Sequence, residues 1–227
     1  MIKNIMPFSL LHLLFFLFLL FILMLVVQFG LVGIAFEKLG LSSQSAYLLL
    51  FTSLLGSLIN LPLFSVKSSP PKEPRLPVTY GLLRLPPIAF TGRTSINVNV
   101  GGCLVPVMFS LYLVQHHPLQ LWQLITGICS ISVISYLVSR PIHGIGIGMP
   151  VFIAPVTAAI VATLISRSDS APLAYVSGTL GVLIGADILR LRNIKAMGLP
   201  MASIGGAGTF DGIFLTGIIA VLLAGVF

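Results

Sequence analysis

Long apolar stretches dominate this chain, with little alternation of apolar and polar positions. A helix that crosses the hydrocarbon core of a bilayer needs about 20 consecutive apolar residues. Stretches close to that length occupy residues 8–29, 45–64, 96–114, 119–138, 149–165, 171–189 and 210–227. The pattern therefore predicts seven membrane-spanning helices.

Two of the segments between these stretches differ from short polar turns. Residues 66–95 hold several basic residues and a cluster of prolines, which predicts one long loop. Residues 194–206 are apolar, but they are too few and too rich in Gly and Pro to cross a bilayer. Irregular backbone at membrane depth must be buried in protein or line a cavity, so this segment is expected to dip into the membrane as a buried hairpin.

The distribution of Lys and Arg sets the orientation, because cytoplasmic loops retain them. With the N-terminus inside and the C-terminus outside, only Lys38 and Arg167 of the 12 basic residues fall on the outer side. The remaining ones alternate correctly through every loop. This agreement supports seven spans and makes the 66–95 loop cytoplasmic.

Composition agrees with a membrane protein. Hydrophobic residues make up 57% of the 227 and charged residues 7%, whereas soluble domains carry about 25% charged residues. The expected fold class is all-α: one polytopic transmembrane helix bundle over residues 1–227. It has two N-terminal spans in 1–65, the basic Pro-rich loop in 66–95 and a five-span core in 96–227.

The net charge of +7 does not indicate nucleic-acid binding, because the basic residues are scattered and form no stripe with aromatics. Cys103 and Cys129 lie inside apolar stretches and are expected to be small buried hydrophobes. We therefore expect no nucleic-acid partner, no metal site and no cofactor.

Acidic residues inside a span are costly and need a partner, a proton or a function. Asp187 ends the sixth predicted span and Asp211 begins the seventh, so both are expected near the cytoplasmic face. Two carboxyl groups that approach within about 5 Å share a proton and can act together as acid and base. The alternative is structural: Asp211 caps its helix, while Asp187 pairs with Arg190 one turn on.

Other unusual groups are expected at the same level. Asn97 and Asn99 open the third span, where they either hold a substrate or satisfy irregular backbone. The connection after the fourth span contains His143 and then glycines at every second position, Gly144, Gly146 and Gly148, which predicts a strand-like segment. Gly208 and Thr209 precede Asp211. These residues are the candidate substrate-binding groups.

Glycines also form a row on the sixth span. Gly178, Gly181 and Gly185 recur at helical spacing, which lets a neighbouring helix approach closely. A regular helix turns by about 100° per residue, so Asp187 is expected on the side opposite to this row.

Four segments together resemble a bacterial and archaeal membrane-protein family known as a domain of unknown function. They are Asn99–Gly102, Pro141–Pro150, Ser177–Leu189 and Ser203–Gly217, and the resemblance covers roughly the last 130 residues. It implies a prokaryotic inner-membrane location and no particular activity.

A looser similarity is to the intramembrane aspartyl proteases of the presenilin, signal-peptide-peptidase and prepilin-peptidase type. In presenilin-like members one aspartate ends a helix that enters the cytoplasm, and its partner begins the next helix in a Gly-x-Gly-Asp motif. Asp187 and Asp211 resemble that pair. Phe210 replaces the second glycine of the motif, Ala186 stands where presenilins have tyrosine, and no Pro-Ala-Leu segment follows.

The leading functional hypothesis is a membrane-embedded hydrolase that acts on membrane proteins or peptides and uses Asp187 and Asp211 as catalytic acids. One alternative is a transporter or channel in which the same aspartates carry protons or bind a cation. Another is a non-catalytic membrane scaffold. In each case the lipid bilayer is the expected partner.

Overall fold

Helices make up most of the computed structural model, which describes residues 14, 17–22, 36–37, 39–68, 79–80, 83–84, 92–142, 146–197, 199–206 and 212–226. Within residues 39–226 the described helices are α3 (Ser43–Gly56), α4 (Val105–His116), α5 (Leu121–Val138), α6 (Ile153–Ile165), α7 (Ser170–Val182), α8 (Leu191–Met197) and α9 (Gly212–Val226), and residues 14, 17–22 and 36–37 are also helical. Two π-helical segments, which have wider turns than an α-helix, extend two of these helices. η1 (Val100–Leu104) leads into α4, and η2 (Leu183–Ile188) continues α7.

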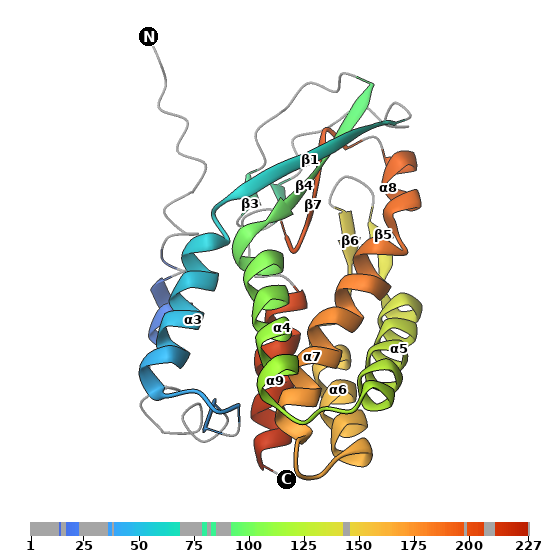
Figure 1. The fold of residues 1–227 in the computed structure, drawn as a ribbon. Helices are drawn as coiled ribbons and strands as arrows, with labels where there is room; N and C mark the ends of the chain where they lie inside the picture. The colour runs from blue at the N-terminus through green and yellow to red at the C-terminus, as the bar shows by residue number, and fades with distance from the viewer. Residues whose placement is uncertain are drawn as a thin grey trace.

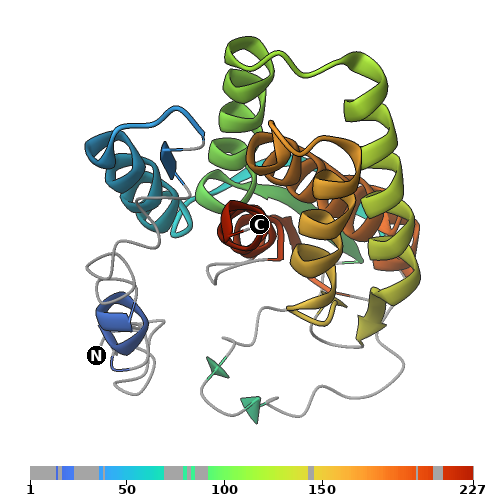
Figure 2. The same ribbon diagram turned by 90° about the horizontal axis from the view of Figure 1, so that it is seen from below.

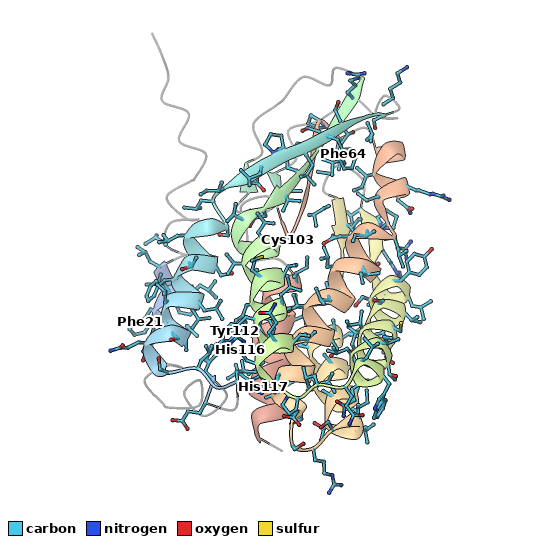
Figure 3. All side chains as sticks on the ribbon, in the orientation of Figure 1. Phe21, Phe64, Cys103, Tyr112, His116 and His117 are labelled. Carbon is cyan, nitrogen blue, oxygen red and sulfur yellow. The ribbon has the colours of Figure 1, made fainter. Side chains whose placement is uncertain are left out.

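The helices α4, α5, α6, α7 and α9 form a bundle with α3 at its side (Figure 1). Viewed along the bundle, α7 lies among the other helices of the core (Figure 2). It packs against α4, α5, α6 and α9, and every residue from Ser170 to Thr179 is buried. Small side chains allow this close packing, since Ala154, Ala158 and Ala162 of α6 are all fully buried.

A three-stranded sheet covers one end of the bundle, which we call the sheet end (Figure 1). Its strands are β1 (Asn60–Lys67), β4 (Arg93–Asn99) and β7 (Met201–Ile204). The central strand β4 is antiparallel to β1 and parallel to β7. Two small hairpins complete the strands: β2 (Thr79–Tyr80) with β3 (Leu83–Arg84), and β5 (Arg140–Ile142) with β6 (Gly146–Gly148).

The sheet corrects the all-α prediction. Residues 60–64 were expected to end the second span and residues 96–99 to begin the third, but both segments are strands that pair with each other. Inter-strand hydrogen bonds therefore satisfy their backbone groups in place of helical ones. The expected hairpin at 194–206 instead contains the end of α8 and the strand β7.

Two helices of the described residues are long and apolar enough to cross a membrane, where the sequence predicted seven. They are Leu121–Val138 and Ser170–Ile194, the second of which joins α7, η2 and the start of α8. The apolar helices Gln44–Gly56, Val100–His116 and Ile153–Ile165 are shorter. At about 1.5 Å per residue, the 13 residues of α6 extend only about 20 Å.

Two neighbouring helices, α5 and α9, pack against the glycine row of α7 and η2. A Cβ added at Gly181 would lie 2.6 Å from Cβ of Ile131, and one at Gly185 would lie 2.2 Å from the carbonyl oxygen of Ser132, so both glycines pack on α5. A Cβ at Gly178 would instead meet Thr216 of α9 at 3.0 Å. The close helix approach is therefore present, but it is divided between α5 and α9.

Candidate functional site at the sheet end

Asn99 holds the junction between β4 and α4. Its side-chain oxygen accepts a hydrogen bond from the backbone N–H of Gly102 at 2.7 Å, which caps η1. Its amide nitrogen donates to the carbonyl of Ser57 at 2.6 Å and to the side-chain oxygen of Asn60 at 3.2 Å. The side chain is 0% exposed. Asn99 therefore satisfies irregular backbone, the second of the two roles expected for it.

A row of polar side chains follows one face of the sheet. Cross-strand partners share a face, and β4 places Ser95, Asn97 and Asn99 at alternate positions. Asn97 is paired with Ser203 of β7 in the sheet register, and Asn99 with Asn60 of β1. The hydroxyl of Ser203 donates to the side-chain oxygen of Asn60 at 2.6 Å. A polar contact thus links two strands that lie far apart in the sequence.

Asn97 belongs to this row and is also buried, with 6% of its surface exposed. Its side-chain oxygen accepts a hydrogen bond from the hydroxyl of Ser95 at 2.8 Å. The opposite face of β4 carries Ile96 and Val98, which are buried as well. The structure therefore brings Asn97 and Asn99 together on one face, while a substrate-binding role for them stays a prediction.

Glycines make a tight crossing next to this row, where α3, η1 and the end of β7 meet. Gly101 lies against the backbone of Ser53 and Gly56, and the hydroxyl of Ser53 donates to the carbonyl of Gly101. An added Cβ on Gly102 would lie 2.0 Å from the carbonyl oxygen of Gly205. Gly205 itself has a φ of 81°, a conformation that favours glycine. Only glycine fits this crossing without displacing backbone.

Asp187 lies in η2, at the sheet end of α7, and its side chain is half-buried. The wider turn of η2 alters the regular 100° step, and the side on which Asp187 lies stays a prediction. π-helical turns are rare and are often found at functional sites. The residues just before Asp187 pack on α5 through the contact of Gly185 with Ser132.

Arg190 ties the end of this helix to the end of α5. Its guanidinium donates to the carbonyls of Tyr136 and Ser139 at 2.5 and 2.9 Å and to the Ser139 hydroxyl at 3.3 Å, and it lies 4.2 Å from the centre of the Tyr136 ring. A positive charge at a helix C-terminus is favourable for the helix dipole. The hydrogen bonds of Arg190 therefore stabilise the end of α5.

Some of the other candidate residues lie in the described part of the chain, and some lie outside it. Gly146 and Gly148 lie in β6, so this part of the glycine-rich connection is extended as predicted. Asp211, His143, Gly144, Gly208 and Thr209 lie outside the described residues. The convergence of Asp187 and Asp211 therefore stays a prediction.

The packing of α9 on α7 nevertheless fixes the level at which α9 begins. The two helices are antiparallel and meet at Gly178 and Thr216. Gly212, the first residue of α9, precedes Thr216 by four residues, and Val182 follows Gly178 by four residues. Gly212 is therefore level with Val182. Asp187 lies five residues further toward the sheet end. Both helix ends therefore reach the sheet end of the bundle.

A family model for a protein of unknown function, DUF1614, matches residues 54–223, about three quarters of the chain. The chain belongs to this family. The match begins at residue 54, before Asn99, the first residue of the four segments that resemble such a family. It therefore includes β1 and the glycine crossing at Gly101. It carries no statement of activity. Comparison with curated proteins gave no match, and no solved structure matches the chain.

Proposed function

We propose that the chain is an integral membrane protein whose bundle lies in the bilayer. Large apolar side chains on the outer faces of the bundle support this placement. Leu121 and Leu137 of α5 are 72% and 70% exposed, and Leu164 of α6 is 81% exposed. Further exposed apolar residues lie on α3, α4 and α6, including Leu48, Leu55, Met108, Leu111, Val156 and Ile160. Contiguous apolar surfaces of this kind mark contact with a membrane or a partner.

The charged residues support one orientation. Lys67, Arg93, Arg140, Arg190 and Arg192 lie in or beside the elements of the sheet end, whereas Arg167 lies in the connection between α6 and α7 at the opposite end. Cytoplasmic loops carry the excess of Lys and Arg. The sheet end therefore faces the cytoplasm in this proposal.

The activity that we propose is hydrolysis inside the membrane by Asp187 and Asp211, with a membrane protein or peptide as the substrate. This proposal depends on the position of Asp187. Its carboxyl group is half-buried and lies in a π-helical turn, at the end of the bundle where α9 begins. A carboxyl group seldom stays in such surroundings without a functional or structural reason. The resemblance to intramembrane aspartyl proteases supplies the second acid.

The chemistry that follows uses one ionised and one protonated carboxyl. The ionised group takes a proton from water while the water oxygen bonds to the carbonyl carbon of the scissile amide. The protonated group gives its proton to the carbonyl oxygen. The C–N bond of the tetrahedral intermediate then breaks, the nitrogen takes a proton from one carboxyl, and a hydroxyl of the intermediate gives its proton to the other, ionised carboxyl. A carboxylic acid and an amine leave, and the pair again holds one ionised and one protonated carboxyl.

Purified protein in proteoliposomes tests this proposal. Asp187→Asn and Asp211→Asn are each expected to abolish cleavage of membrane peptides and labelling by an aspartyl transition-state analogue. Asp169→Asn is the matched control, because Asp169 lies between α6 and α7 and accepts a hydrogen bond from the Ser168 hydroxyl at 2.7 Å. Full cleavage by both variants at positions 187 and 211 would refute the proposal. Solute flux without cleavage would indicate a transporter.

A further inference from the structure

Two sets of Ser and Thr hydroxyl groups in the bundle differ in their hydrogen bonds. In one set the hydroxyl donates to the carbonyl four residues earlier, at 2.6 to 2.9 Å, as is usual for Ser and Thr in apolar helices. This set comprises Ser110, Ser130, Thr157, Thr163 and Ser177. In the other set the hydroxyl oxygen is buried and has no hydrogen-bond partner among the described residues. It comprises Ser132, Ser135 and Thr216.

Two members of the second set, Ser132 and Ser135, lie on the same face of α5 and are 7% and 0% exposed. α5 and α7 run in the same direction, and their contacts pair Gly127 with Ser177, Ser132 with Gly185, and Ser139 with Arg190. The residue numbers in these pairs differ by about 50. Ser135 is therefore level with η2, close to the level of Asp187.

The backbone of η2 departs from regular α-helical pairing beside these hydroxyls. The N–H of Leu189 bonds back to the carbonyl of Ile184, five residues earlier, at 2.9 Å. Hydroxyl groups that can both donate and accept therefore lie on the face of α5 that packs against this turn, at about the level of the Asp187 carboxyl group. A buried water needs two to four such partners. A buried hydroxyl without a hydrogen-bond partner is unfavourable, and a bound water supplies the missing partner.

We propose that Ser132 and Ser135 bind water beside η2 and form the inner part of a water path from the sheet end to Asp187. Ser139, one turn beyond Ser135, continues the same face to the end of α5, where it contacts Arg190. The inference rests on the proposed membrane placement and supplies the water that the proposed hydrolysis consumes. It concerns access of water, so it is tested separately from cleavage.

The test uses single cysteines in full-length protein in which Cys103 and Cys129 are replaced by Ala. Ser132→Cys and Ser135→Cys are compared with Ser177→Cys, a matched control that is equally buried but whose hydroxyl is bonded to Leu173. A charged methanethiosulfonate reagent is added at the sheet-end side of oriented vesicles. It reacts with thiolate, which forms in contact with water and not in apolar surroundings.

We expect Ser135→Cys to react roughly tenfold faster or more than Ser177→Cys, with Ser132→Cys intermediate. The same ratio is expected in an Asp187→Asn background, where cleavage would be lost, so failure of the water path and failure of the hydrolase are distinguishable. Equal slow rates at positions 135 and 177 would overturn the proposal. Protection of position 135 by Na⁺ and not by choline would also overturn it, because the site would then hold a cation.

Discussion

Gly205→Ala tests the glycine crossing at which β7 meets η1. Two separate costs are expected. Alanine in a left-handed conformation costs about 1–2 kcal/mol, and Gly205 has a φ of 81°. In addition, the new Cβ would lie 2.7 Å from the backbone nitrogen of Cys103 and 2.8 Å from the carbonyl carbon of Gly102, and overpacking against such neighbours costs about 1–3 kcal/mol. The total is about 2–5 kcal/mol.

Gly92→Ala is the matched control for the conformational part. Gly92 has nearly the same φ, 79°, but an added Cβ would meet nothing within 4 Å. Its replacement is therefore expected to cost only about 1–2 kcal/mol. The two variants would be compared by thermal unfolding in detergent, where about 1 kcal/mol corresponds to a shift of about 2–4 °C in Tm for a chain of this size. Equal losses of stability would show that the crossing at Gly205 is not tightly packed.

Three further variants test the contacts of Asn99 and Arg190 and the exposure of α5 to lipid. Asn99→Ala should lower stability by roughly 2–4 kcal/mol, because it leaves the buried Gly102 N–H and Ser57 carbonyl without their partner; chemical unfolding would measure this. Arg190→Ala should cost about 1.5–3 kcal/mol through the lost charge-assisted bonds to α5, and Arg190→Lys, which lacks the planar fork, should recover only part. Val133→Arg, on the exposed face of α5, should make the free energy of membrane insertion less favourable by about 2.5–3.5 kcal/mol. If the fraction of protein found in the membrane did not change, this face of α5 would not contact lipid.

The helices of the core were predictable from the sequence because their apolar stretches exceed the length of any ordinary strand. The sheet was not predicted, because short apolar runs fit either structure and were added to the adjoining helices. A signal for β4 was nevertheless present: Ser95, Asn97 and Asn99 alternate with the apolar, β-branched Ile96 and Val98. That period of two is typical of a strand.

The site was predictable to a smaller extent. The polar amides of β4 and the extended glycines of β6 follow from residue type and spacing. Hydropathy contains no signal for the contact between Asn60 and Ser203, because it depends on how β1 and β7 flank β4. The π-helical turn at Asp187 was also unpredictable, since a regular helical projection assumes a constant step.

The most direct test of the account is whether positions 187 and 211 converge. Cysteines at both positions, in protein with Cys103 and Cys129 replaced by Ala, would be treated with a short bis-methanethiosulfonate crosslinker. Trypsin would then cut at Arg190, Arg192 and Lys195, which lie between the two positions, and mass spectrometry would show whether the fragments stay joined.

A pair at Ser139 and Arg190 is the positive control, because Nε of Arg190 lies 3.3 Å from Oγ of Ser139, so the two Cβ atoms are separated by little more than the length of an arginine side chain. We expect the 187–211 pair to crosslink as completely as this control. Crosslinking of the control alone, with the fragments carrying positions 187 and 211 released separately, would contradict the proposed aspartate pair.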